Sequence, residues 1–328
     1  MTLALIFALA AALSYLALWL ALRARLGQHF LDHATARSLH RGATPRIGWI
    51  GITLGTVGAL VVLANPAQLR WSAELLAWIC AVLAVFLVSL FDDLRRLSAG
   101  VRLTVHLVSA SLLAIGWQLP WAVLLLVAIL LVWGSNLFNF MDGSDGLAGG
   151  MAAFGFGALS LAAGSAGHLS LAAISAALAG SAIGFLPMNW YPARLFLGDA
   201  GSIPLGFLAG AIGVQGVLVG AWSMWFPLCV FFPFLFDASL TLIRRALRRE
   251  NLARAHREHL YQRAVLAGLG HRGVALSAYV LMLLSATSAL VGLQYSTGIQ
   301  VAILIGVVVI HCALWLRLEA RIASRPLE

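Results

Sequence analysis

Long apolar segments separated by short polar ones dominate the pattern of this 328-residue chain. Most apolar segments approach the roughly 20 residues that a helix needs to cross a lipid bilayer. Backbone groups inside lipid must hydrogen-bond within their own segment, and alternating polarity typical of a membrane β-barrel is missing, so helices are expected. The pattern predicts an all-α polytopic protein with about eleven transmembrane helices, or ten, because several runs are short or glycine-rich. The eleven runs are 3–22, 47–64, 72–90, 101–117, 120–138, 149–164, 169–187, 201–219, 221–243, 274–293 and 299–316.

Composition agrees with this pattern. The chain is 62% hydrophobic and only 10% charged, whereas soluble domains carry about 25% charged residues. A soluble protein with one large core would lack the polar residues to cover its surface. We found no long linker, low-complexity tail or soluble domain, so residues 1–328 are predicted to form a single transmembrane domain.

The basic residues predict a topology. All 21 are arginines, and those that follow the first run, Arg23 and Arg25, place the N-terminus outside and the C-terminus in the cytoplasm. With that orientation, every arginine except Arg70 falls in a cytoplasmic segment. The net charge of +9 then reflects topology and anionic lipid headgroups, and nucleic-acid binding is not expected. The loops expected to form an active-site face are 23–46, 91–102, 139–148, 188–200 and 244–273.

Two adjacent acids end the third run, in "SLFDDLRRLSAGVRL" (89–103). On a helix, the side chains of Asp92 and Asp93 would diverge by about 100° and could serve different roles. Paired acids raise one another's pKa unless a cation intervenes. The arginines that follow could simply neutralise them, or the acids could act as a base or metal ligand near the headgroup plane.

Two further motifs place acids beside glycines. "NLFNFMDGSDGLAGG" (136–150) carries Asn136, Asn139, Asp142 and Asp145 directly after an apolar run, and "RLFLGDAGSIPLGFLAG" (194–210) carries Asp199 at the start of another. An aspartate at a helix N-terminus can be an ordinary cap. The same place offers backbone N–H groups and a carboxylate to a phosphate–Mg²⁺ complex.

Basic side chains mark two more candidate positions. His256, Arg257 and His259 lie in the longest loop, and the two histidines would share a face if the segment were helical. No third ligand of a zinc motif accompanies them, so the cluster suits a phosphate or diphosphate better than zinc; an ordinary basic interfacial loop is the alternative. Arg46, in "SLHRGATPRIGWIG" (38–51), could bind an anionic headgroup or merely follow the topology.

Together, "ATPRIG", "FDD", "NLFNFMDGSDGLAGG", "LGDAGS" and "HREHLYQR" resemble, in their order, the motifs of one family. This is the polyprenyl-phosphate N-acetylhexosamine-1-phosphate transferases of glycosyltransferase family 4. The resemblance implies transfer of a sugar 1-phosphate from a UDP-N-acetylhexosamine to undecaprenyl phosphate, with release of UMP. It also implies Mg²⁺, with Mn²⁺ as a substitute ion, a multi-pass protein of the bacterial inner membrane, a cytoplasmic active site and, by analogy, a homodimer.

The resemblance also implies residue roles. Asp199 is the leading Mg²⁺ ligand, with Asp142 as a second, while Asp92 would deprotonate or orient the lipid phosphate with help from Asp93. Because the second pKa of a phosphate is near 6, much of the acceptor is dianionic at neutral pH and needs no strict base. The substrate-binding set is Arg46, Asn136, Asn139, Asp142, Asp145, His256, Arg257 and His259, with Asp145 near the uracil and the basic trio at the donor diphosphate or sugar.

The last motif lacks the run of three histidines that marks the muramoyl-pentapeptide branch. This favours the branch that starts O-antigen and related cell-envelope glycans, such as lipopolysaccharide, with GlcNAc or a 6-deoxy HexNAc as the sugar. A UbiA-type prenyltransferase is one rival interpretation, but its acids are usually four apart, whereas Asp142 and Asp145 are three apart. A transporter is the other rival, and it would more naturally place its polar residues near the bilayer midplane.

Overall fold

The computed structural model describes residues 2–33, 43–63, 72–95, 97–251 and 256–323. Parts of the predicted loops 23–46, 91–102 and 244–273, and also Arg70, lie outside the described residues.

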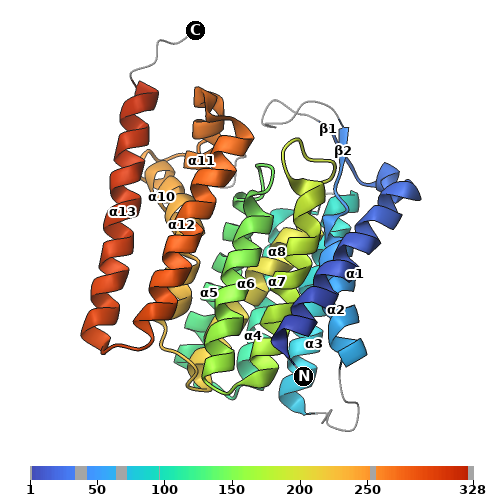
Figure 1. The fold of residues 1–328 in the computed structure, drawn as a ribbon, viewed down its shortest axis with the longest axis vertical. Helices are drawn as coiled ribbons and strands as arrows, with labels where there is room; N and C mark the ends of the chain where they lie inside the picture. The colour runs from blue at the N-terminus through green and yellow to red at the C-terminus, as the bar shows by residue number, and fades with distance from the viewer. Residues whose placement is uncertain (1, 34–42, 64–71, 96, 252–255, 324–328) are drawn as a thin grey trace.

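Each apolar run forms helix, so the predicted all-α polytopic fold is confirmed (Figure 1). Among the described residues, nine helices are long and apolar enough to cross a membrane. A shorter apolar helix, α2, adds to them, and a small antiparallel hairpin of β1 and β2 lies between α1 and α2. The elements are α1 (Leu3–Arg23), η1 (Leu26–His29), β1 (Leu31–His33), β2 (Ala43–Pro45), α2 (Gly48–Leu63), α3 (Ala73–Arg95), α4 (Ala99–Gly116), α5 (Trp121–Phe140), α6 (Leu147–Ser165), α7 (Leu169–Asn189), α8 (Asp199–Leu218), α9 (Trp225–Val230), α10 (Phe232–Leu247), α11 (Leu260–Ala264), the π-helical turn η3 (Val265–Leu269), α12 (Gly270–Gly292) and α13 (Thr297–Ala323).

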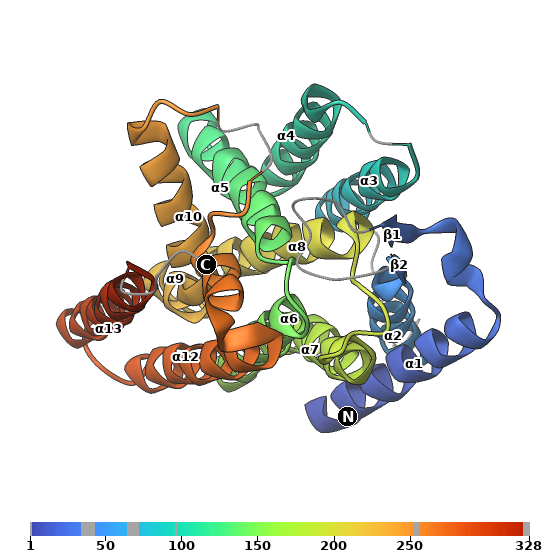
Figure 2. The same cartoon turned by 90° about the horizontal axis from the view of Figure 1, so that it is seen from above.

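The ninth run differs from the expected single helix 221–243. It is divided at Phe231 into the short helix α9 and the longer helix α10. Pro233 lies in the first turn of α10, where a proline is tolerated because the N–H that it lacks would have no partner within the helix. In the interior of one continuous helix, the same proline would interrupt the backbone hydrogen bonds. The break lets α10 run in a different direction from α9 (Figure 2).

The helices are arranged around a buried centre. Most residues of α6, α7 and α8 are buried, while α13 is the least buried of the spanning helices. Viewed from above, α1 and α2 lie beside α7, α3 to α5 lie around α8, and α12 and α13 lie on the other side (Figure 2). The small residues of α6 and α7, many of them alanine and glycine, allow this close packing.

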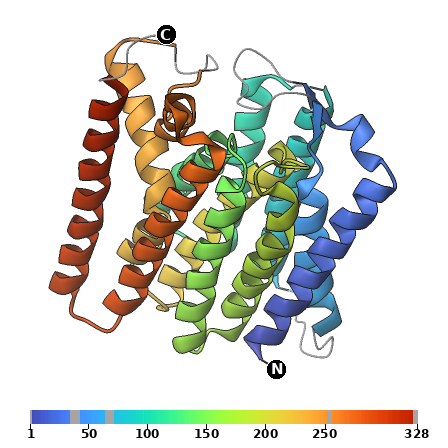
Figure 3. The same cartoon turned by 45° about the horizontal axis from the view of Figure 1, so that its top comes forward.

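Several polar segments meet at one end of the bundle. The β1–β2 hairpin, the loop between α5 and α6, the loop before α8 and helix α11 lie at this end, whereas α1 begins at the opposite end (Figure 3). The loops expected to form one face therefore do share one end of the molecule in their described parts. That this end faces the cytoplasm stays a prediction.

We expect Gly206→Ala to destabilise the bundle. A Cβ at this position of α8 would overlap the backbone carbonyl of Gly134 on α5, and overpacking of this kind costs about 1–3 kcal/mol. Gly157→Ala on α6 is the matched control, since a Cβ there meets open space and alanine favours a helix by up to about 1 kcal/mol. Thermal unfolding in detergent should show a lower Tm for the first variant only, and equal Tm values would contradict the close α5–α8 contact.

Candidate active site

Five carboxylates from four parts of the chain gather at the polar end of the bundle. We call them the acidic cluster: Asp32, Asp92, Asp93, Asp142 and Asp199. Two arginines, Arg46 and Arg102, form ion pairs with members of this cluster. The sequence motifs that carry these residues therefore meet in space.

Asp92 and Asp93 lie in the last turn of α3 and point to different partners, as their helical spacing predicts. One oxygen of Asp92 accepts the N–H of Leu97 (2.6 Å), and the other pairs with Arg102 (2.6 Å). Asp93 instead accepts the N–H of Ala200 through Oδ2 (2.9 Å). Its side chain is 1% exposed, and its buried Oδ1 accepts no hydrogen bond from the described groups but lies 3.5 Å from Arg46 Nη1. Asp93 thus joins α3 to α8 and also pairs with Arg46.

Asp199 is the first residue of α8, at the partly positive end of the helix dipole. The preceding Gly198 has φ of +77°, and a Cβ there would come within 3.0 Å of Asp93 Oδ2. Glycine is therefore needed both for the backbone turn and for the approach of α3. Asp199 Oδ2 also lies 3.6 Å from Arg102 Nη1, so this arginine spans Asp92 and Asp199.

Arg46 follows β2 and connects the hairpin to the cluster. Its guanidinium lies 2.6 Å from Asp32 and 3.5 Å from Asp93. Its backbone forms a β-bridge with Phe196 in the loop before α8. Burial lowers the pKa of Arg46, but the attraction of Asp32, Asp199 and Asp93 outweighs it and raises that pKa overall. Its position supports a role in the site beyond the topology rule.

Asp142 lies in the loop between α5 and α6 and is half-buried. Burial, followed by the negative charge of Asp199, raises the pKa of Asp142 well above its usual value. The charges of Asp93 and Asp32 act in the same direction, and the charge of Arg46 opposes them. The carboxylate of Asp142 therefore interacts electrostatically with those of Asp199 and Asp93, which is why we include it in the acidic cluster.

Among the described residues, ion pairs join two guanidinium groups to this set of five carboxylates, so acidic side chains outnumber basic ones in the described part of the cluster. A hard divalent cation prefers oxygen ligands, and the buried Asp93 Oδ1 accepts no hydrogen bond here, although it lies 3.5 Å from Arg46 Nη1. The donor set thus fits Mg²⁺ chemically. Within the described residues, however, no three His, Cys, Asp or Glu side chains converge into a preformed metal centre.

Asp145 points to other groups than Asp142 does. It is 6% exposed, accepts the N–H of Ala193 (3.0 Å), and lies 3.6 Å from His271 Nδ1. The ring of His271 stacks on that of Tyr191, with centroids 5.7 Å apart. The two aspartates of the motif therefore have separate surroundings: Asp142 faces the acidic cluster, and Asp145 faces the start of α12 and the loop after α7.

The two asparagines of this motif have unequal environments. Asn139, near the end of α5, accepts a hydrogen bond from Ser202 Oγ in the first turn of α8 (2.8 Å). Asn136 lies one turn earlier and donates to the carbonyl of Val132 in its own helix (2.7 Å). Asn139 thus helps to join α5 to α8 at the cluster.

His256 and His259 do not share a helix face, because residues 256–259 precede α11 and are not helical. The two rings are nevertheless neighbours, with centroids 4.9 Å apart. His259 is 3% exposed and stacks on Phe140 (5.8 Å), the last residue of α5, whereas Arg257 is exposed. Burial, then the charges of His259 and Arg245, lower the pKa of His256 to about 4. We call residues 256–259 the histidine segment.

Sequence reasoning did not assign roles to Asp32, Arg102 or His271. Asp32 lies 14 residues before Arg46 and meets it only through the hairpin. Arg102 lies within the "FDD" stretch, ten residues after Asp92, so the sequence could have suggested that the two residues pair. His271 is 126 residues from Asp145, and no local pattern connects them.

Comparison with known proteins points to one family. The glycosyl transferase family 4 model matches residues 75–217. A probable undecaprenyl-phosphate N-acetylglucosaminyl 1-phosphate transferase from Bacillus subtilis (strain 168) is 28% identical over 279 residues, covering 80% of this chain and 76% of the relative. A decaprenyl-phosphate N-acetylglucosaminephosphotransferase from Mycobacterium tuberculosis is 28% identical, covering 88% of this chain and 81% of the relative.

A third relative is 32% identical over 223 residues: the phospho-N-acetylmuramoyl-pentapeptide-transferase of Moorella thermoacetica, with 59% of this chain and 68% of the relative covered. The fold and the acidic cluster define a multi-pass membrane protein with a polar site at one end of its helices. The chain belongs to glycosyl transferase family 4, and it is therefore a transferase of the membrane. This membership favours the sugar-phosphate transferase interpretation over the two rivals, a UbiA-type prenyltransferase and a transporter.

We expect Asp142→Asn to raise thermal stability when divalent cations are removed with EDTA. The raised pKa of Asp142 in the folded protein means that its ionisation opposes folding. Stability is retained while the group is protonated in both states and is lost as the pH rises from the unfolded-state pKa through the folded one. The Tm gain of the variant should therefore be larger near pH 8 than near about pH 5. Glu74→Gln, at the far end of α3, is the control, and a gain independent of pH would contradict the prediction.

Proposed function

We propose that this protein transfers an N-acetylhexosamine 1-phosphate from a UDP-sugar to undecaprenyl phosphate and releases UMP. The proposed location is the bacterial inner membrane, with the site on the cytoplasmic side. The observation that carries the proposal is the acidic cluster at the ends of α3, α5 and α8, in a membrane protein of this transferase family. The activities named for the relatives support the same class of reaction.

The charge of the cluster suits the chemistry. Both substrates are anionic phosphates, and their approach requires positive charge and accurate positioning. Asp199 and Asp142 would hold Mg²⁺, and Asp93 Oδ1, which lies 3.5 Å from Arg46 Nη1, would be a further candidate ligand. When bound, Mg²⁺ would neutralise phosphate oxygens and stabilise the charge of the transition state. Arg46 and Arg102 would add positive charge while also setting the positions of the carboxylates.

A lipid acceptor also needs an apolar site, and the fold has a groove beside the cluster. α5, α8, α9 and α10 line it, and Trp133, Phe138, Val214, Phe231 and Leu235 are among its side chains. The groove reaches Phe138, next to Asn139 and about one turn from the loop of Asp142. A prenyl chain in this groove would bring its phosphate to the end of α5, where the acidic cluster lies.

Asp92 and Asp93 of α3 would position the groups around the acceptor phosphate rather than act as strict bases. The carboxylate of Asp92 is occupied by Arg102 and the N–H of Leu97. The acceptor phosphate itself is largely dianionic at neutral pH. Asp92 would therefore act by holding Arg102 near Asp199, and Asp93 by holding the start of α8.

The remaining residues would bind the donor. Asn139 and Asp145 lie on either side of Asp142 in the chain, and Asp145 is directed toward His271 and Tyr191. This supports a nucleotide role for Asp145, separate from the metal role of Asp142. Arg257 is exposed, and His256 is neutral at physiological pH because its pKa is lowered to about 4. These side chains would donate hydrogen bonds to the diphosphate or the sugar.

We keep the proposal that the product starts an O-antigen or related cell-envelope glycan such as lipopolysaccharide. It rests on the histidine segment, in which Glu258 separates His259 from the preceding residues and no run of three histidines occurs. The proposed sugar is GlcNAc or a 6-deoxy HexNAc. The relatives named above include both GlcNAc and muramoyl-pentapeptide transferases, so a donor panel with mass analysis of the lipid product is the deciding test of the sugar.

The purified protein should convert labelled UDP-N-acetylhexosamine into a lipid-soluble product only when undecaprenyl phosphate is supplied. Equal amounts of UMP and lipid-linked sugar 1-phosphate are expected. EDTA should abolish the reaction, and Mg²⁺ should restore it. Release of UMP without a lipid product would overturn the proposal, and uptake of label into membrane vesicles without lipid product would favour transport instead.

Asp199→Asn should reduce kcat by about 10²–10³-fold, because it removes one charged oxygen from the proposed metal site. The Mg²⁺ concentration for half-maximal rate should rise as well, which separates a metal ligand from a residue needed only for folding. Glu74→Gln again serves as a carboxylate control at the opposite end of the bundle. Near-normal turnover of Asp199→Asn at saturating Mg²⁺ would exclude the assignment.

A further inference from the structure

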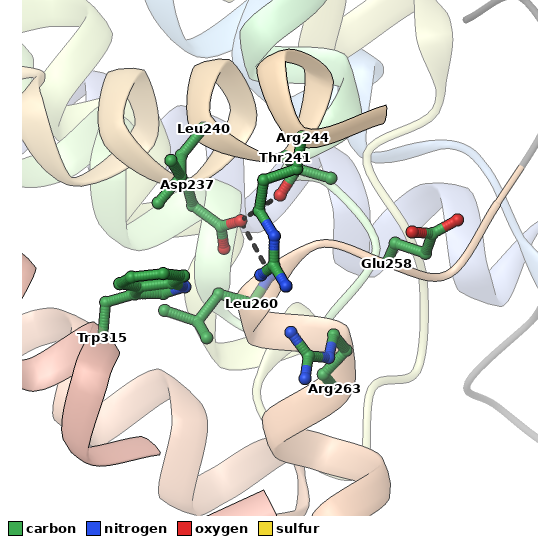
Figure 4. A pocket seen from close by; sticks show the side chains of 8 residues that line it. All are labelled: Asp237, Leu240, Thr241, Arg244, Glu258, Leu260, Arg263 and Trp315. Atoms are coloured by element: carbon green, nitrogen blue, oxygen red, sulfur yellow. Dashed lines mark hydrogen bonds between the residues drawn. The ribbon is translucent and has the colours of Figure 1, made fainter. Parts of the chain in front are cut away.

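A seventh aspartate, Asp237, lies outside the acidic cluster, on α10, and is 6% exposed. Figure 4 shows its carboxylate between α10 and the start of α11, in a pocket that also contains Thr241 and Leu260. Neither the proposed metal site nor the proposed donor site uses this residue. A buried carboxylate is costly unless its oxygens are satisfied, so its hydrogen-bond partners indicate its role.

Those partners lie mainly in α11. The Oδ1 atom accepts the N–H of Leu260 (2.8 Å), and Oδ2 accepts the N–H of Tyr261 (3.0 Å). Thr241, one turn along α10, also donates to Oδ1 (3.2 Å). Backbone N–H groups in the first turn of a helix have no partner within that helix. Asp237 therefore caps α11 from another helix, immediately beside the histidine segment.

Tyr261 connects the same place to the loop of Asp142. Its hydroxyl donates to the carbonyl of Phe140 (3.0 Å), two residues before Asp142. The hydroxyl also lies against Gly143, where any Cβ would overlap it. The Tyr261 side chain thus extends from α11 to the α5–α6 loop, where Gly143 has no Cβ to overlap it.

His259 lies between these two connections. Its Nδ1 atom is 3.6 Å from Asp237 Oδ1, and its ring stacks on the rings of Phe140 and Tyr261. Residues 256–259 have no regular secondary structure of their own, whereas α11 continues through η3 into α12. The orientation of the histidine segment must therefore come from such tertiary contacts.

We infer that Asp237 and Tyr261 are positioning residues that hold the histidine segment in line with the acidic cluster. Asp237 attaches the segment to α10, and Tyr261 attaches it to the loop of Asp142. Neither residue is assigned contact with the reacting atoms. The inference rests on the proposed function, because alignment affects turnover only if the histidine segment binds the donor. A small misplacement of such a segment can reduce the rate by up to about 100-fold.

Two near-isosteric variants test this inference in the full-length protein. Asp237→Asn turns one acceptor oxygen into an NH₂ group that would face a backbone N–H, and Tyr261→Phe removes only the hydroxyl. We expect kcat/KM for UDP-N-acetylhexosamine to fall about 10- to 100-fold in each. Because both residues hold one segment, the double variant should lose less than the product of the single effects. Glu74→Gln and Tyr295→Phe, remote from the site, are the matched controls.

A second measurement does not depend on activity. Histidine modification by diethyl pyrocarbonate, located by mass spectrometry, should be slow at the buried His259 in the wild type and faster in both variants. The buried His106 and His311 should stay protected, which separates local release from unfolding. If Asp237→Asn unfolds and exposes all three, the milder Tyr261→Phe decides the question.

Unchanged protection of His259 in the folded variants would overturn the inference. So would faster modification with kcat/KM within about twofold of the wild type, since alignment would then not matter. The proposed function fails differently: the wild type itself would then form no lipid-linked sugar. In that case the modification experiment would still show whether the two residues hold the histidine segment.

Discussion

Mutual repulsion among half-buried carboxylates is the constraint on which this site depends. Asp93, Asp142 and Asp199 come from three different segments and raise one another's energy when ionised. Left alone, such groups would separate or take up protons. Each is held by a different element: Asp93 by the N–H of Ala200, Asp199 by its place at the start of α8, and Asp142 by a short loop between two helices. The scaffold thus holds these carboxylates together against their mutual repulsion.

Two arginines relieve part of this repulsion without removing it. Arg102 spans Asp92 and Asp199, and Arg46 spans Asp32 and Asp93. Each arginine comes from a segment that also packs against a cluster-bearing element, so positive charge and local structure are supplied together. The remaining negative charge lies at the polar end of the bundle. Anionic phosphates would need a metal ion to approach it. The stability lost to this arrangement is typical of sites kept for function rather than for folding.

The sequence predicted the helices well because lipid leaves the backbone few alternatives, and the apolar runs have the required length. It also predicted that Asp92 and Asp93 would diverge, because adjacent residues on a helix always do. The break at Phe231 was missed, although Pro233 was visible, because hydrophobicity continues through it. Contacts between loops could not be predicted: Asp32 meets Arg46, and Tyr261 meets Phe140, only after the helices have packed. For the same reason the histidines are neighbours without being on a helix.

The break at Phe231 also has a structural consequence for the two substrates. It directs α10 so that Phe231, Phe234 and Leu235 line the apolar groove, while Asp237, two residues further on, caps α11. One helix therefore borders the proposed site of the lipid chain and also holds the segment proposed to bind the donor. Displacement of α10 by a chain in the groove would be transmitted to His259 over less than one turn of helix. If the groove holds the acceptor chain, α10 would connect binding of the acceptor to the alignment of the histidine segment.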